Sequence, residues 1–105
     1  MARVEVMAGV CGFTSVIEAK ADDNYHVTLR ICSDCAQIQA MGEMLTSLSA
    51  LDEMRLSITE TRPYRVGAAC KVHAACPVPC AVIKAMEVAC SLALPADVAI
   101  KVSKA

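Results

Sequence analysis

The spacing of the apolar residues changes once along this chain, and that change limits the folds it can adopt. Up to Ile31 the apolar residues tend to recur at every second position, which predicts strands with one buried face. Three such segments, residues 3–8, 13–20 and 25–31, are separated by the turn-forming stretches AGVCGF and ADDN. We therefore expect an antiparallel three-strand meander.

Beyond Ile31 the apolar spacing is helical. Apolar residues at every third or fourth position predict a first helix over residues 35–49. Prolines at the start of two further segments predict a short helix over 63–72 and a longer one over 77–94. The stretch ALDEMRLSITETR fits a longer first helix, a loop or a short strand, and residues 98–102 alternate again as a final strand.

These elements predict an α+β fold in one domain, residues 1–105. We expect a small antiparallel sheet, made of the three-strand meander and the C-terminal strand, with two or three helices on one face. Hydrophobic residues make up 56% of the chain but aromatic residues only 3%, so the core should be aliphatic.

Composition also limits the partners and the compartment. The net charge is -1, no long basic run occurs, and stacking aromatics are scarce, so we expect no nucleic-acid partner. Lys84 and Glu87 interrupt the most apolar window, residues 74–94, which argues against a membrane span. The N-terminus has no apolar targeting block, so we expect a cytoplasmic protein. Its apolar surface leaves room for a homodimer or an unknown protein partner.

Seven cysteines are unusual in so short a chain. Their odd number and a reducing cytosol disfavour structural disulfides, so metal or redox chemistry is expected. A free cysteine is also a common small core residue. We assign this role to Cys90, which lies beside Ala89 and Met86 on the predicted buried side of the last helix.

Four of the other cysteines lie at the ends of predicted elements. Cys11 lies in the first turn, Cys35 in the first turn of the first helix, Cys70 at the end of the short helix and Cys76 at the N-cap of the last. Helix N-termini stabilise thiolates, and four thiolates suit zinc or an iron–sulfur cluster. We predict a non-catalytic metal site formed by these four residues.

Other interpretations stay open. The sequence CSDC, Cys32 to Cys35, is typical of a redox dithiol. Cys80 lies one turn after Cys76 and is an alternative fourth ligand to Cys70, or simply a small residue. His73 precedes Cys76 by three residues, but no third orienting group accompanies them, so we assign no catalytic residue. An interaction domain with inert thiols is a further alternative.

The stretch CPVPCAVIK resembles the CPxP signature of TusA-type sulfur carriers, which hold a persulfide on the cysteine. Cys76, Pro77 and Pro79 match this signature, and Lys84 stands where those carriers often have a basic residue. The resemblance implies a sulfur carrier or transferase that acts through Cys76. In those carriers the motif follows the first strand, whereas here three predicted strands and a helix precede it.

Over nearly its full length, the chain also resembles an uncharacterised family of small proteins from anaerobic prokaryotes. The stretches VCGFTSVIEA, SDC and HAACPVPCAVIKAMEVACSLALPADV carry this resemblance. It implies functional roles for Cys11, Cys35 and Cys76 and, less directly, for Cys70 with His73. An anaerobic setting would suit an oxygen-sensitive cluster.

Overall fold

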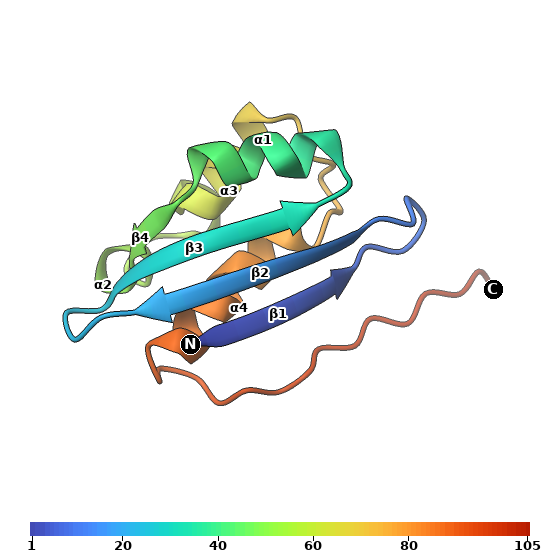
Figure 1. Ribbon diagram of the computed structural model, residues 1–105. Helices are drawn as coiled ribbons and strands as arrows, with labels where there is room; N and C mark the ends of the chain where they lie inside the picture. The colour runs from blue at the N-terminus through green and yellow to red at the C-terminus, as the bar shows by residue number, and fades with distance from the viewer.

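The computed structural model describes residues 1–105, and its sheet contains the predicted meander (Figure 1). Four strands pair antiparallel in the order β1 (Ala2–Met7), β2 (Thr14–Ala21), β3 (His26–Ser33) and β4 (Ser47–Ser49). The first three lie within two residues of their predicted bounds. In this register Ile17 of β2 lies opposite Val4 of β1 and Ile31 of β3. Residues directly opposite one another on paired strands point to the same side of the sheet, so these side chains belong to one apolar face.

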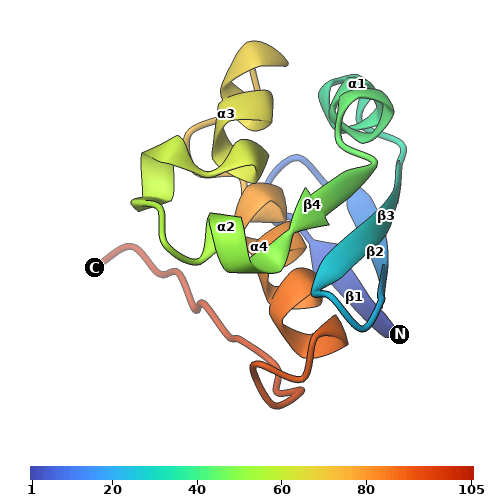
Figure 2. The ribbon, with the colours of Figure 1, turned by 90° about the vertical axis from the view of Figure 1, so that its left-hand side faces the viewer.

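The helices cover that face. They are α1 (Ala36–Met44), α2 (Ala50–Glu53), α3 (Arg62–Ala69) and α4 (Val78–Ala89), with a 3₁₀ turn, η1 (Ile58–Glu60). Figure 2 shows the sheet edge-on, with α2, α3 and α4 to one side of it. The predicted α+β class is therefore confirmed. None of these helices has the length and apolar character needed to cross a membrane.

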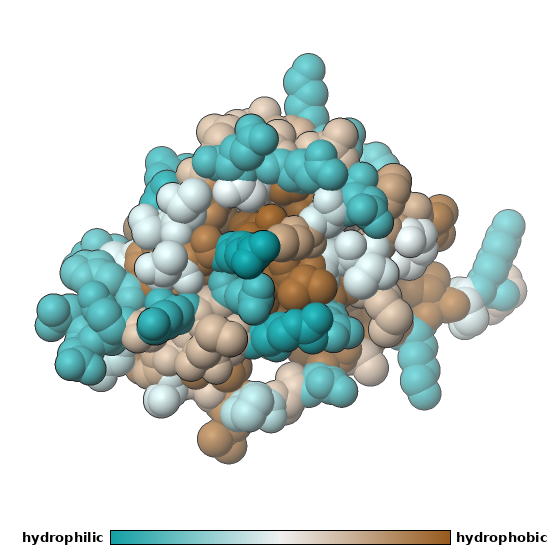
Figure 3. All heavy atoms as spheres, viewed as in Figure 1, coloured by the Kyte–Doolittle hydropathy of each residue, from teal (hydrophilic) through white to brown (hydrophobic).

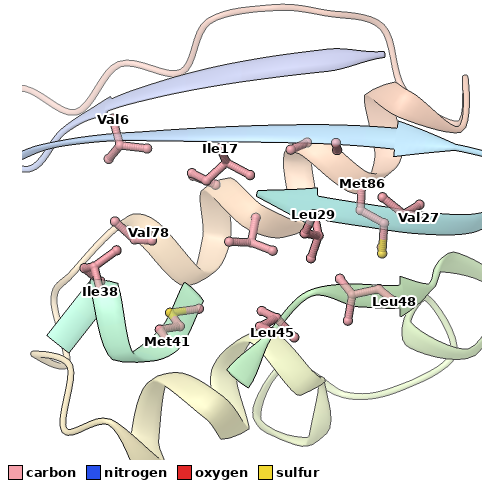
Figure 4. Packing of buried hydrophobic residues seen from close by; sticks show 14 of the residues in the cluster. Val6, Ile17, Val27, Leu29, Ile38, Met41, Leu45, Leu48, Val78 and Met86 are labelled. Carbon is pink, nitrogen blue, oxygen red and sulfur yellow. The ribbon is translucent and has the colours of Figure 1, made fainter. Parts of the chain in front are cut away.

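The core lies between the sheet and the helices and is aliphatic, as predicted. In Figure 4 the sheet contributes Ile17, Val27 and Leu29, which point toward Met41 of α1 and Met86 of α4. The opposite face of the sheet carries alternating polar side chains, and Figure 3 shows that hydrophilic residues cover much of it. The sheet is thus buried on one side only, which explains the clear period of two.

The first helix is shorter than predicted. It ends at Met44, because Leu45 leaves the helical conformation with φ -118° and ψ 85°. The chain then forms β4, where Leu48 pairs with Val27 and is buried. Leu48 fits helical spacing after Leu45, but it reaches the core from a strand. The predicted helical end at Ser49 was therefore wrong.

The predicted C-terminal strand was also wrong, and the fourth strand is β4 instead. Residues 95–105 have no regular secondary structure, and Val98, Ile100 and Val102 are 60%, 79% and 90% exposed. Alternation makes a segment able to form a strand, but a strand also needs an edge to pair with. Figure 2 shows the C-terminal segment leading away from β1.

The last helix ends five residues before the predicted end. After Ala89 the chain continues to Ser91, which has a left-handed φ of 57°, and the Leu92 N–H donates to the Glu87 carbonyl. This arrangement closes a helix by satisfying its last carbonyl groups. The apolar stretch that follows, residues 90–94, therefore lies outside the helix.

Candidate thiol site

Three segments that carry cysteines meet at one end of the sheet. They are the β1–β2 turn with Cys11, the β3–α1 connection with Cys35 and the chain leading into α4 with Cys76, all on the right in Figure 1. The pKa of Cys76 is raised chiefly by burial and, to a smaller extent, by repulsion from Cys35 and Cys11. Three of the four predicted ligands therefore lie on segments that meet at this end of the sheet.

Cys76 immediately precedes the N-cap of α4. The helix begins at Val78 with Pro77 as its N-cap, one residue later than predicted. The Cys76 N–H donates to the carbonyl of His73 over 3.0 Å, and this bond closes the preceding turn. The Val78 N–H in turn donates to the Cys76 sulfur. A proline at the start of the helix thus leaves an N–H group available to the thiol.

Burial is the main influence on the pKa of Cys76. The half-buried thiol has a raised pKa, chiefly because burial disfavours the thiolate, although the Val78 N–H lowers the pKa in opposition. Repulsion by Cys35 and Cys11 adds to the increase. Metal-free Cys76 is therefore mainly a neutral thiol at pH 7, and a nearby cation would favour its thiolate.

Cys35 is the N-cap residue of α1, as its predicted place in the first helical turn suggested. A short chain of hydrogen bonds holds its backbone: the Cys35 N–H donates to the Ser33 hydroxyl over 3.1 Å, and the buried Ser15 hydroxyl donates to the same oxygen over 2.8 Å. The Cys35 thiol donates to Oε1 of Gln37. Two strands and a helix therefore fix the position of this residue.

Cys11 lies in the exposed β1–β2 turn. Gly9 and Gly12 have φ values of +88° and +73°, which L side chains rarely adopt, and the Gly12 N–H donates to the Gly9 carbonyl. A side-chain carbon added at either glycine would have no heavy atom within 4 Å. The two glycines thus shape the turn, which has free space around it.

Cys70 lies elsewhere. It follows α3, and its thiol donates to Sδ of Met44 over 3.6 Å. Met44 ends α1, nine residues after Cys35, which corresponds to about 13 Å along a helix. The structure therefore separates Cys70 from the N-terminal end of α1, where Cys35 lies.

None of the seven cysteines forms a disulfide. The three that remain, Cys32, Cys80 and Cys90, lie in different surroundings. Cys32 is exposed on the sheet face away from the helices. Cys80 is exposed on α4 beside the Tyr64 hydroxyl, and burial followed by the nearby Cys80 raises the pKa of Tyr64. Cys90, predicted to be in the core, is half-buried at the end of α4, where burial and then Asp22 raise its pKa.

No group of three or more His, Cys, Asp or Glu side chains is arranged to hold a metal ion in this conformation. The three cysteines at the sheet end lie on neighbouring segments, but their side chains do not form a set of metal ligands. A metal would have to draw at least one of them inward. Cys11 is the best placed to move, because it is exposed and its turn has open space around it.

A pocket of about 390 Å³ adjoins Cys76, and it was not predicted from the sequence. It lies between α3, the turn after it and the start of α4, where a side-chain carbon on Gly67 would come within 3.2 Å of Pro79. The spacing of Gly67, His73 and Cys76 indicates this pocket only once α3 and α4 are known to pack together. The residues that line the pocket are Thr59, Tyr64, Arg65, Gly67, Ala68, Val72, His73, Ala74, Cys76 and Pro79.

Comparison with known families agrees with the full-length resemblance found in the sequence. A profile described as "Family of unknown function (DUF6951)" matches residues 2–102. The chain belongs to this family. The match spans all three cysteine-bearing segments of the DUF6951 chain and most of its C-terminal segment, and it lends no support to the local resemblance to TusA-type carriers. Searches of curated proteins and of solved structures found no match.

Proposed function

We propose that this protein binds a thiolate-preferring metal centre, a zinc ion or an iron–sulfur cluster, in the cytoplasm. Its protein ligands are Cys11, Cys35 and Cys76. The observation that carries the proposal is that the three segments that carry these cysteines meet at one end of the sheet. Thiolate sulfur is a ligand that both zinc and iron–sulfur centres use. The centre serves storage, assembly or electron transfer rather than catalysis by the chain itself.

Charge supports this proposal. The pKa of Cys76 is raised first by burial and then by repulsion from Cys35 and Cys11. A bound cation replaces the repulsion by attraction and favours the ionised form of each ligand, so that metal binding releases protons. The hydrogen bond from the Val78 N–H further stabilises a thiolate at Cys76.

The positions of the three residues favour a site in which two ligands are held in place and the third can move toward them. Cys35 is held by the Ser33 and Ser15 hydroxyls, and Cys76 by the turn that closes on His73. Cys11 lies on the exposed turn, which has space to move toward them. Two fixed ligands and one mobile ligand allow a metal to enter from solvent before the site closes. Cys70 is left out of this ligand set because of its contact with Met44.

A sulfur carrier that holds a persulfide on Cys76 is the alternative. It is favoured by the position of Cys76 on the wall of a pocket, where a sulfur donor can approach, and by the Val78 N–H directed at its sulfur. The raised pKa of Cys76 weighs against it, because the attacking species in persulfide transfer is the thiolate. A third option, an interaction domain with inert thiols, draws no support from the grouping of the three cysteines.

The deciding experiment measures zinc, iron and acid-labile sulfide, with a visible spectrum, on protein purified without oxygen. We expect a stoichiometric metal that is lost in Cys35→Ser and in Cys76→Ser. The matched control is Cys32→Ser, three residues from Cys35 but on the opposite face of the sheet, and it should keep the metal.

Three other results would reject or redirect the proposal. Metal-free protein after reconstitution with iron and sulfide, and with zinc, would rule it out. A mass increase of one sulfur atom on Cys76 after incubation with a sulfur donor would then favour the carrier. Slow and equal alkylation of all seven thiols would favour the inert domain.

A further inference from the structure

The pocket between α3 and the start of α4 is mainly apolar where its lining is buried. Gly67 and Pro79 are buried, and Tyr64, Val72 and Cys76 are half-buried. The volume of about 390 Å³ falls within the range of pockets that hold small organic molecules. Apolar walls combined with a few converging polar groups are typical of such sites. The inner part of the pocket therefore suits the apolar body of a small ligand.

The exposed part of the lining carries hydrogen-bond donors. Thr59 comes from η1, Arg65 from α3 and His73 from the turn that follows α3. The half-buried Tyr64 adds a second hydroxyl. A guanidinium has only donors, and an imidazole donates from one ring nitrogen even when it is neutral. Four side chains that can donate hydrogen bonds, from three segments of the chain, thus surround the pocket.

The charge around the pocket is positive. No aspartate or glutamate lines it, and the three ion pairs of the chain involve basic residues other than Arg65. The carboxylate of Glu60, close by in the sequence, accepts the Ser57 hydroxyl over 2.8 Å and is not part of the lining. The guanidinium of Arg65 is therefore available to pair with a negatively charged ligand.

The number of donors fits a phosphate group better than a carboxylate. A carboxylate has two oxygens in one plane, whereas a phosphate monoester has three strong acceptor oxygens in a tetrahedral arrangement and a charge of about −1.5 to −2 at pH 7. Its oxygens can accept donors that approach from different directions, and a guanidinium can pair with it through two parallel hydrogen bonds. Because the donors are mostly exposed, the phosphate also keeps part of its hydration, which lowers the cost of binding it.

We propose that this pocket binds a small organic phosphate monoester. Arg65 pairs with the phosphate, and the side chains of Thr59, Tyr64 and His73 donate to its remaining acceptor sites. The organic body lies in the apolar inner part of the pocket. This inference goes beyond the proposed metal site and does not depend on a metal ion, because every group that it uses lines the pocket.

The test is an amide NMR titration of the full chain with phenyl phosphate, which combines the phosphate with a compact apolar body. We expect saturable shifts at Ala68, Val72 and Ala74, which line the pocket, and none at Glu18 on the open face of the sheet. Inorganic phosphate lacks the apolar body and should bind at least about tenfold more weakly. Benzoate has the same apolar body with a planar head group and should also bind more weakly than phenyl phosphate.

A matched pair of variants tests the role of the cation. Arg65→Gln removes the guanidinium from the pocket and should weaken the binding of phenyl phosphate about fivefold, as for the loss of an exposed charge pair. Arg30→Gln removes an exposed arginine from the open face of the sheet and should leave the binding unchanged. Both side chains are exposed, so an otherwise unchanged amide spectrum is expected of each variant.

Each alternative result would overturn a stated part of the inference. Absence of shifts at the lining residues would overturn the site itself. Equal binding of inorganic phosphate would mean an adventitious ion only, and equal binding of benzoate would overturn the choice of a phosphate. Undiminished binding by Arg65→Gln would reject the pairing with this arginine. The shifts do not report metal content, so failure of the proposed metal site would leave this inference standing.

Discussion

The thiol of Cys70 lies 3.6 Å from the sulfur of Met44, at the end of α1 opposite to Cys35. Because of this contact, Cys70 is part of the packing between α1 and α3. We predict that Cys70→Ala keeps the full metal content and loses about 1 kcal/mol of unfolding free energy through the lost contacts. Metal analysis and urea unfolding measure both quantities. Loss of metal in Cys70→Ala with the fold intact would restore Cys70 as a ligand.

The contrast between Cys70 and Cys76 shows how far sequence reasoning reached. Cys70 follows α3 as predicted, whereas Cys76 lies one residue before the N-cap of α4 and not at the N-cap itself. Proline positions and apolar spacing indicate where these helices begin. Which helix ends lie close together depends on how the helices cross the sheet. The spacing of apolar residues along the chain does not reveal how the helices cross. Only the structure shows that the segments of Cys76, Cys11 and Cys35 meet at one end of the sheet, while Cys70 contacts Met44 at the far end of α1.

The sheet shows the same division between local and long-range information. Strands β1, β2 and β3 were predictable because each is buried on one face, which imposes a period of two, and because turn residues separate them. Leu48 misled the prediction, since a three-residue strand is too short to show a period. Val98 and Ile100 misled it in the opposite way, since they alternate without a partner edge.

Metal-free protein should lose stability at alkaline pH. The pKa values of Cys76 and Cys90 are raised above the ordinary value of 9.0, mainly by burial. Below that value both thiols are neutral in the folded and unfolded states, so neither changes the stability with pH. As the pH rises, the unfolded chain ionises first and is favoured, and the loss continues until the folded thiols also ionise.

We therefore predict that the urea midpoint of the metal-free protein falls between about pH 8.5 and 10. The double variant Cys76→Ala with Cys90→Ala should show a smaller fall over the same interval. The control Cys32→Ala removes an exposed thiol and should follow the parent protein. A midpoint that rises with pH in this interval would contradict the prediction.

Gly42 sets the distance between α1 and β3. A side-chain carbon at this position would come within 2.9 Å of the Ile31 carbonyl oxygen and 3.3 Å of the Ile31 Cβ. Gly42→Ala gains about 1 kcal/mol in helix propensity, but the clash with backbone costs about 1–3 kcal/mol, so we expect a net loss of about 1 kcal/mol. Thermal or urea unfolding measures this, and the exposed neighbour variant Glu43→Ala should change little. A more stable Gly42→Ala would show that α1 can shift freely.

Glu53 stabilises the start of α3. Glu53 is 4% exposed, and its carboxylate accepts the Arg62 N–H at 3.2 and 3.3 Å, while the N-cap residue Thr61 makes no side-chain cap. Glu53→Ala leaves that N–H without its partner and should cost about 2 kcal/mol, whereas Glu53→Gln keeps an acceptor and should cost less. Urea unfolding compares them with Asp52→Ala, which removes an exposed ion pair and should cost under about 1 kcal/mol. Equal losses for Glu53→Ala and Glu53→Gln would show that the charge, not the hydrogen bond, is what matters.

The C-terminal segment contributes little to the stability of the fold. The side chains of Val98, Ile100 and Val102 are largely exposed, and no strand pairs with this segment. We predict that removal of residues 96–105 changes the unfolding free energy by less than about 0.5 kcal/mol, the range of surface changes that disturb no contact. Val82→Ala, at a fully buried position of α4, should cost about 2 kcal/mol and calibrates the measurement. A loss of unfolding free energy near that of Val82→Ala would mean that residues 98–102 pair with an edge of the sheet in solution. The unpaired edge of β1 would be the first edge to test for this pairing.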